Sequence, residues 1–111
     1  MDRSGLIERV GRVETACAEA GSDASSVAAA LVAVRELDGW LASRKALLVG
    51  RLQEVSSFPE ATIADADRTS IGAATKSTER SDTLASTPKL ADALGDGAIS
   101  TGHVDAVTRT S

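Results

Sequence analysis

Apolar side chains recur between residues 24 and 55 at spacings of three, four and seven, which bring them to one face of a helix. No proline interrupts this stretch, and most of its other residues are good helix formers. The pattern predicts one helix of about 30 residues, roughly 45 Å long. We expect the flanking segments to bury its apolar stripe, so that replacing Leu41 by Ala would cost about 2–5 kcal/mol. The stripe consists of Val27, Leu31, Val34, Leu41, Leu48, Leu52 and Val55, interrupted by Asp38 and Lys45.

A narrower apolar seam precedes the long helix, with the alternating steps of four and three residues that are typical of two packed helices. Asp2 or Ser4 can cap its start, and Gly21 suits a left-handed C-cap. The connection is short, so we expect the two helices to run antiparallel, with the seam facing the first half of the long helix. The seam consists of Leu6, Val10, Val13, Cys17 and Ala20, and Cys17 is interpreted as a small core residue. Candidate caps of the long helix are Ser22, Asp23, Ser25 and Ser26.

Two short helices are predicted after the long one. Pro59 suits the first position of a helix over 59–66, and Thr69 or Ser70 can cap another over 71–84. The second of these is rich in Ser and Thr, which are weak helix formers. We therefore expect it to be helical only when it packs against another element.

The last two predicted helices are separated by a glycine-containing turn at 95–97. Thr87 followed by Pro88 predicts the start of the first, and Ser100 the cap of the second. The chain stops about three turns into the last helix. The patterns together predict an all-α fold: an antiparallel helix pair with one long helix, plus short C-terminal helices. We expect 1–111 to be a single helical domain that is incomplete at its C-terminus.

The composition allows only a small core. Apolar residues make up 42% of the 111 residues, but 20 of them are Ala and only 24 are Leu, Ile, Val or Phe. The net charge of −4 argues against strong sequence-independent binding to nucleic acid. One cysteine excludes an internal disulfide, and no signal peptide or long apolar run is visible, so we expect a cytoplasmic protein that does not enter a membrane.

The C-terminal quarter carries a recognisable motif: Pro, an Ala- and Leu-rich helix, Gly, then Ile-Ser, two residues and His. These are Pro88, Leu90, Ala91, Leu94, Gly97, Ile99, Ser100 and His103. The motif resembles the actinobacterial DUF222 family, also called the 13E12 repeat family. The stretches 37–42 with Arg44, 58–60 and 68–70 are similar to further landmarks of that family, in the same order.

The resemblance implies a mainly helical region with no established activity of its own, found in longer relatives before an HNH endonuclease domain. An HNH unit needs several His and usually Asn around its metal. This chain has one His and no Asn, so no nuclease residue can be carried over. We therefore expect a non-catalytic accessory module that lacks the HNH domain and uses no cofactor, metal or small molecule.

A DNA-binding helix-turn-helix over 88–111 is the alternative, because the same stretch is similar to ParB-type partition proteins. Gly97 permits the sharp turn, Ser100 caps, and the following helix could enter a major groove. The same parts also make a purely structural corner. Relatives often carry several Arg over 73–80, where this chain keeps only a Lys and an Arg. The candidate nucleic-acid contacts are Lys76, Arg80, His103 and Arg109.

Two further expectations concern His103 and the long helix. His103 has Asp92, Asp96 and Asp105 near it in sequence, but the three or four convergent ligands of a metal site are not visible. We expect it to cap or pack near the turn. A half-covered apolar face on a long helix invites a second chain, so a homo-oligomer through that helix is the third possibility.

Overall fold

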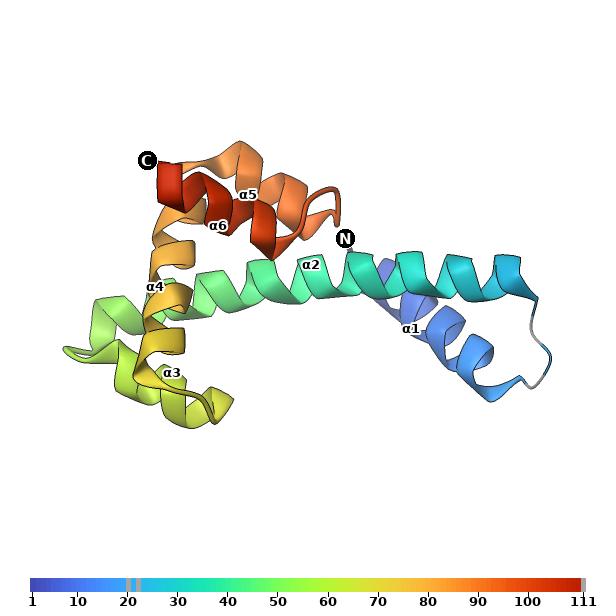
Figure 1. Ribbon diagram of the computed structural model, residues 1–111, viewed down its shortest axis with the longest axis horizontal. Helices are drawn as coiled ribbons and strands as arrows, with labels where there is room; N and C mark the ends of the chain where they lie inside the picture. The colour runs from blue at the N-terminus through green and yellow to red at the C-terminus, as the bar shows by residue number, and fades with distance from the viewer. Residues whose placement is uncertain (20, 22, 111) are drawn as a thin grey trace.

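The computed structural model describes residues 1–19, 21 and 23–110, which form helices and no strand (Figure 1). The predicted all-α fold is therefore confirmed. The helices are α1 (Arg3–Ala18), α2 (Ala24–Val55), α3 (Pro59–Asp67), α4 (Ile71–Ser86), α5 (Pro88–Gly95) and α6 (Thr101–Thr110). α1 returns along the first half of α2, while α3, α4 and α5 gather around its second half and α6 packs on α4 (Figure 1).

Side-chain caps fix where three of the helices begin. Asp2, Asp23 and Ser70 each accept a hydrogen bond from the backbone N–H three residues on, at 2.7, 2.8 and 3.1 Å. The hydrogen bond from the Ser26 backbone lowers the pKa of the Asp23 carboxyl. Of the predicted alternatives, Asp2 rather than Ser4 caps α1.

Two predicted helix ends differ in detail. α1 ends at Ala18, whereas the predicted limit was Ala20. Ala20, and Ser22 among the candidate caps of α2, lie outside the described residues. Thr87 makes no side-chain capping hydrogen bond, so Pro88 at the first position of α5 is what remains of that start motif. Its fixed φ and missing N–H suit this position.

The predicted seam of α1 packs on α2 only in part, since Leu6 and Val13 are half-buried. Ala30 and Ala33 of α2 are buried beneath it, while Val10 and Cys17 of α1 are exposed. The interpretation of Cys17 as a core residue is therefore wrong. The physical reason is that alanines let the two helix axes approach closely, and the ion pair Arg9–Glu36 (3.0 Å) spans the contact.

The predicted burial of the α2 stripe is also wrong. Leu41, Leu48 and Val55 are 58%, 69% and 83% exposed, so the expected cost of replacing Leu41 by Ala does not apply. The buried residues of α2 are mostly small: Ala30, Ala33, Gly39, Ser43 and Val49.

The close approach of two backbones explains why α2 buries its small residues and not its leucine stripe. A Cβ at Gly39 would lie 2.4 Å from the carbonyl oxygen of Leu94, in α5. Gly97, in the turn after α5, has φ +77°, and a Cβ there would lie 2.7 Å from Cα of Glu36. Because a leucine face cannot come this close to another backbone, α5 and its turn pack on the glycine side of α2 and leave the leucines outside.

α4 is helical in spite of its Ser and Thr content. Several of its hydroxyls donate to backbone carbonyls three or four residues earlier within the helix. Ser81 instead donates to the carbonyl oxygen of Ala46 in α2, at 2.7 Å. The small buried face of α4 allows this crossing. The helix is packed on α2, and its dependence on that packing stays a prediction.

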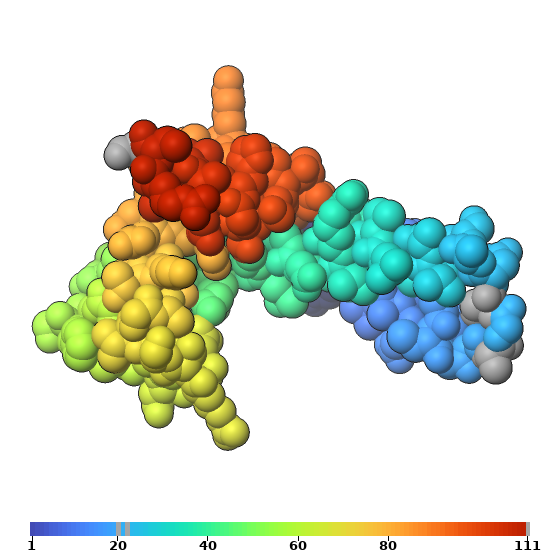
Figure 2. All heavy atoms as spheres, in the orientation of Figure 1, coloured from blue at the N-terminus to red at the C-terminus, as the bar shows by residue number. Residues whose placement is uncertain are grey.

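The core lies around the second half of α2, in two clusters. One joins Val49 with Ile63, Ala64 and Ala74, and the other joins Leu84, Leu94 and Val104. The molecule measures 51 × 29 × 24 Å, and in the space-filling view α1 and the first half of α2 form an arm that extends from the wider end (Figure 2). Among the described helices, none is long and apolar enough to cross a bilayer.

Candidate functional site

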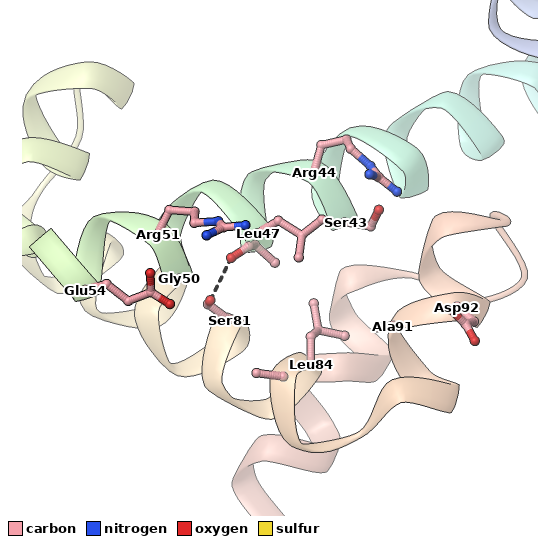
Figure 3. A pocket seen from close by; sticks show the side chains of 12 residues that line it. Ser43, Arg44, Leu47, Gly50, Arg51, Glu54, Ser81, Leu84, Ala91 and Asp92 are labelled. Atoms are coloured by element: carbon pink, nitrogen blue, oxygen red, sulfur yellow. Dashed lines mark hydrogen bonds between the residues drawn. The ribbon is translucent and has the colours of Figure 1, made fainter. Parts of the chain in front are cut away.

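A groove of about 530 Å³ lies between the second half of α2, α4 and α5 (Figure 3). Its apolar wall comes from Leu47 of α2, Leu84 of α4 and Ala91 of α5. Ser81 donates its hydrogen bond to the Ala46 carbonyl at the α2–α4 crossing, within the groove. The groove exists because small side chains keep α4 and α5 close to α2 on one side only.

Charged side chains of both signs line the rim of this groove. Arg44, Arg51 and Glu54 project from α2, and Asp92 lies across from them on α5 (Figure 3). The Arg44 guanidinium also lies 5.6 Å from the ring centroid of Trp40, a cation–π distance. The groove therefore offers an apolar floor between ionic edges, which suits a peptide-like or amphipathic surface.

A second surface is the exposed part of the α2 stripe, on another side of the same helix. We use the name "exposed stripe" for Leu31, Val34, Leu41, Leu48 and Val55, which are between 37% and 83% exposed. Leu52 is partly buried against α3, and Lys45 forms an ion pair with Asp67 at the end of α3. Asp38 is exposed on the stripe.

Three of the four predicted nucleic-acid contacts lie together. Lys76 and Arg80 of α4 and Arg109 of α6 line one small hollow, with Asp105 among them. Arg80 donates two hydrogen bonds to the Asp105 carboxylate, at 2.9 and 2.8 Å. This pairing lowers the pKa of Asp105, helped by the charges of Lys76 and Arg109, and raises the pKa of Arg80.

His103 lies apart from that cluster. It is exposed in the first turn of α6, where its backbone N–H donates to Ser100 Oγ at 3.4 Å. The expected capping role therefore belongs to Ser100, with the backbone of His103 as the donor. Asp105 faces α4 whereas Asp92 lines the groove, so the neighbouring acids do not converge on the imidazole. Within residues 1–19, 21 and 23–110, no group of three His, Cys, Asp or Glu is placed to hold a metal ion.

The groove was not predicted from the sequence, although a pattern for it exists. Small residues follow one face of α2 at steps of three and four, beginning at Gly39 and ending at Gly50. They are Gly39, Ala42, Ser43, Ala46 and Gly50. A periodic run of small residues marks a face for close helix packing, but an apolar count weighted toward Leu and Val overlooks it.

Comparison with protein-family models, curated proteins and solved structures gives no match to this chain.

Proposed function

We propose that this chain is a non-catalytic helical module that binds another protein through α2. In this proposal it is a cytoplasmic accessory module of the kind that precedes HNH endonuclease domains in the DUF222 family. The observation that carries the protein-binding function is the exposed stripe. Leu31, Leu41 and Leu48 are each more than half exposed along one side of a single helix.

A row of exposed leucines along one helix indicates a function, whereas a single exposed leucine does not. Scattered apolar side chains are normal on protein surfaces, whereas contiguous ones mark interaction sites. The stripe, from Leu31 to Val55, extends for about 36 Å at 1.5 Å per residue. Its length and regular spacing suit an apolar partner surface, such as a second helix.

The family-like landmarks support an accessory reading, because they serve as caps and close contacts. Gly39 of the first landmark touches the backbone of Leu94 and Gly97 of the last. Pro59 starts α3 and Ser70 caps α4. These four landmark residues, Gly39, Pro59, Ser70 and Gly97, thus have folding roles, which fits a module that presents a surface to a partner.

The test is binding to a separately expressed HNH domain, taken from a protein whose preceding region carries the same Pro-to-His motif. Isothermal titration should give a saturable complex with the intact chain. Replacing Leu41 and Leu48 by Gln should weaken it at least about tenfold if these side chains lie at the centre of the interface. Leu47→Gln is the matched control, since Leu47 is 59% exposed but faces the groove. Absence of any complex would overturn the accessory role.

DNA binding is the second candidate, favoured by the meeting of Lys76, Arg80 and Arg109 on one surface. Against it, Arg80 is engaged with Asp105, and residues 71–110 hold four Lys or Arg against five Asp or Glu. Anisotropy of a mixed-sequence duplex at low salt tests this. Lys76→Gln and Arg109→Gln should each reduce the salt slope by about 1 if they contact phosphates. Lys89→Gln, an exposed lysine outside the cluster, is the control.

A further inference from the structure

The exposed stripe carries a charge pattern that is complementary to itself. Asp38 and Lys45 are the only charges that interrupt the heptad, and they have opposite sign. The point midway between them lies between Leu41 and Ala42, near the middle of the stripe. A twofold axis through this point, perpendicular to the helix, would bring each Asp38 beside the Lys45 of another copy.

We infer that α2 pairs antiparallel with α2 of a second copy of this chain, stripe against stripe, about a twofold axis at Leu41 and Ala42. The inference rests on the proposed function, in that the exposed stripe binds protein, and it names the partner. Such an interface is isologous: the same patch serves both copies, and the dimer is closed.

Charge selects the antiparallel direction. In a parallel pair, Asp38 would face Asp38 and Lys45 would face Lys45, two repulsive contacts inside an apolar seam. In the antiparallel pair both contacts become attractive. Lys45 is already paired with Asp67 of its own chain, but an ammonium has three N–H donors and can serve both carboxylates.

The geometry of the stripe fits a helix pair. Its outer members Val34, Leu41, Leu48 and Val55 are seven residues apart. A strict seven-residue repeat drifts about 20° per heptad on a straight helix, so two such stripes meet with a left-handed crossing of about 20°.

The area of the stripe determines how strongly the two copies should associate. The stripe is about 36 Å long and a helix about 10 Å wide, a footprint of roughly 360 Å² per copy. Specific stable complexes bury about 800 Å² per partner, and weak ones less. The pair should therefore be concentration-dependent, associating between about 1 μM and 1 mM.

Sedimentation equilibrium over that concentration range tests the pairing. The average mass should rise from 11.3 kDa toward twice that value. Leu48→Gln should weaken association at least about tenfold, because Leu48 lies at the centre of each half of the interface. Below about 1 μM, where the chain is a single copy, its circular dichroism and melting temperature should not change, since the side chain is 69% exposed. Leu47→Gln, which alters the neighbouring leucine on the groove side, should leave association unchanged.

Cysteine cross-linking tests the direction, in a Cys17→Ser background that removes the chain's own thiol. Leu41→Cys lies next to the axis and should give a disulfide-linked dimer. Leu48→Cys alone should not, because its two copies would be about 20 Å apart along the antiparallel pair, too far for a disulfide. A mixture of Val34→Cys and Leu48→Cys chains should link to each other. Linking by Leu48→Cys alone would show a parallel pair and overturn the inference.

The outcomes separate this inference from the proposed function. A strict monomer at about 1 mM, or equal loss of association in the Leu47 and Leu48 variants, overturns the dimer. Binding of an HNH domain is measured on a different complex. A monomer that binds the HNH domain through the stripe would refute self-pairing alone, and a dimer that ignores the HNH domain would refute the accessory role alone.

Discussion

The two halves of α2 are covered in different ways. The first half packs mainly on α1, through alanines and the Arg9–Glu36 ion pair, and the turn after α5 touches it at Glu36. No described residue of α1 is buried. The second half is surrounded by α3, α4 and α5, and both core clusters lie there. The free energy of folding must therefore come mainly from the second half, with the hairpin as an attached arm.

The two halves also bury different sides of the same helix. The α1-facing residues Ala30 and Ala33 and the groove-facing residues Ser43 and Ala46 lie roughly 140° apart at 3.6 residues per turn. The exposed stripe lies between these two sides, bordered by α3 near Leu52 and by the α5–α6 turn near Val34. Along it, Leu41, Leu48 and Val55 stay more than half exposed. One long helix thus offers three sides, two for folding and one for a partner.

The largest difference between the halves should appear on truncating Leu94. Leu94 is fully buried in the cluster with Leu84 and Val104, so Leu94→Ala should lower the free energy of unfolding by about 2–5 kcal/mol. Leu31→Ala, in the first half of α2 and 65% exposed, should cost less than about 0.5 kcal/mol. Urea unfolding followed by circular dichroism measures both. Equal costs would contradict the uneven distribution of the core.

Replacing a glycine by alanine should change the stability in opposite directions at the two sites compared here, Gly39 against α5 and Gly11 in α1. Gly39→Ala would push a methyl group against the Leu94 carbonyl, which is backbone and must move, so a loss of about 1–3 kcal/mol is expected. Gly11 in α1 has nothing within 4 Å of an added Cβ. Gly11→Ala should therefore stabilise the protein by up to about 1 kcal/mol through helix propensity. Thermal unfolding of the two variants should show shifts in opposite directions.

Local signals explain what could be predicted from the sequence. The limits of α2 matched the predicted 24–55, because the Asp23 cap and the break before Pro59 act within a few residues. The all-α class followed from the same kind of evidence. The packing side of α2 could not be predicted by the apolar pattern, because Gly39 and Ala46 contribute through their small size and carry little hydrophobic weight.

For the cationic cluster too, local spacing predicts one part and the fold decides the rest. Lys76 and Arg80 could be paired from their spacing of four residues, but their meeting with Arg109 depends on how α6 packs on α4. The Arg80–Asp105 pair joins residues 25 apart, so no local pattern indicates it. The sequence therefore identifies the cationic residues, but only the fold shows that the charge of Arg80 is neutralised by Asp105.

The smallest effect concerns this ion pair in the well-packed half. Because the pKa of Asp105 is lowered on folding, the pair adds stability at neutral pH, and that stability is lost as the pH falls through the folded pKa, below about pH 4. Asp105→Asn should cost less than about 1 kcal/mol at pH 7, because the carboxylate is 37% exposed and screened by solvent. The gap between the variant and the wild type should close in acid.

Urea unfolding at several pH values from 7 down to about 2.5 measures this gap. Asp82→Asn, on the exposed face of α4, is the matched control and should track the wild type throughout. A gap that persists unchanged in acid would show that Asp105 stabilises the α4–α6 contact through packing rather than charge. In that case Arg80 would be more available to an anionic partner than the geometry indicates, and the cationic cluster would gain weight against the exposed stripe as the functional surface.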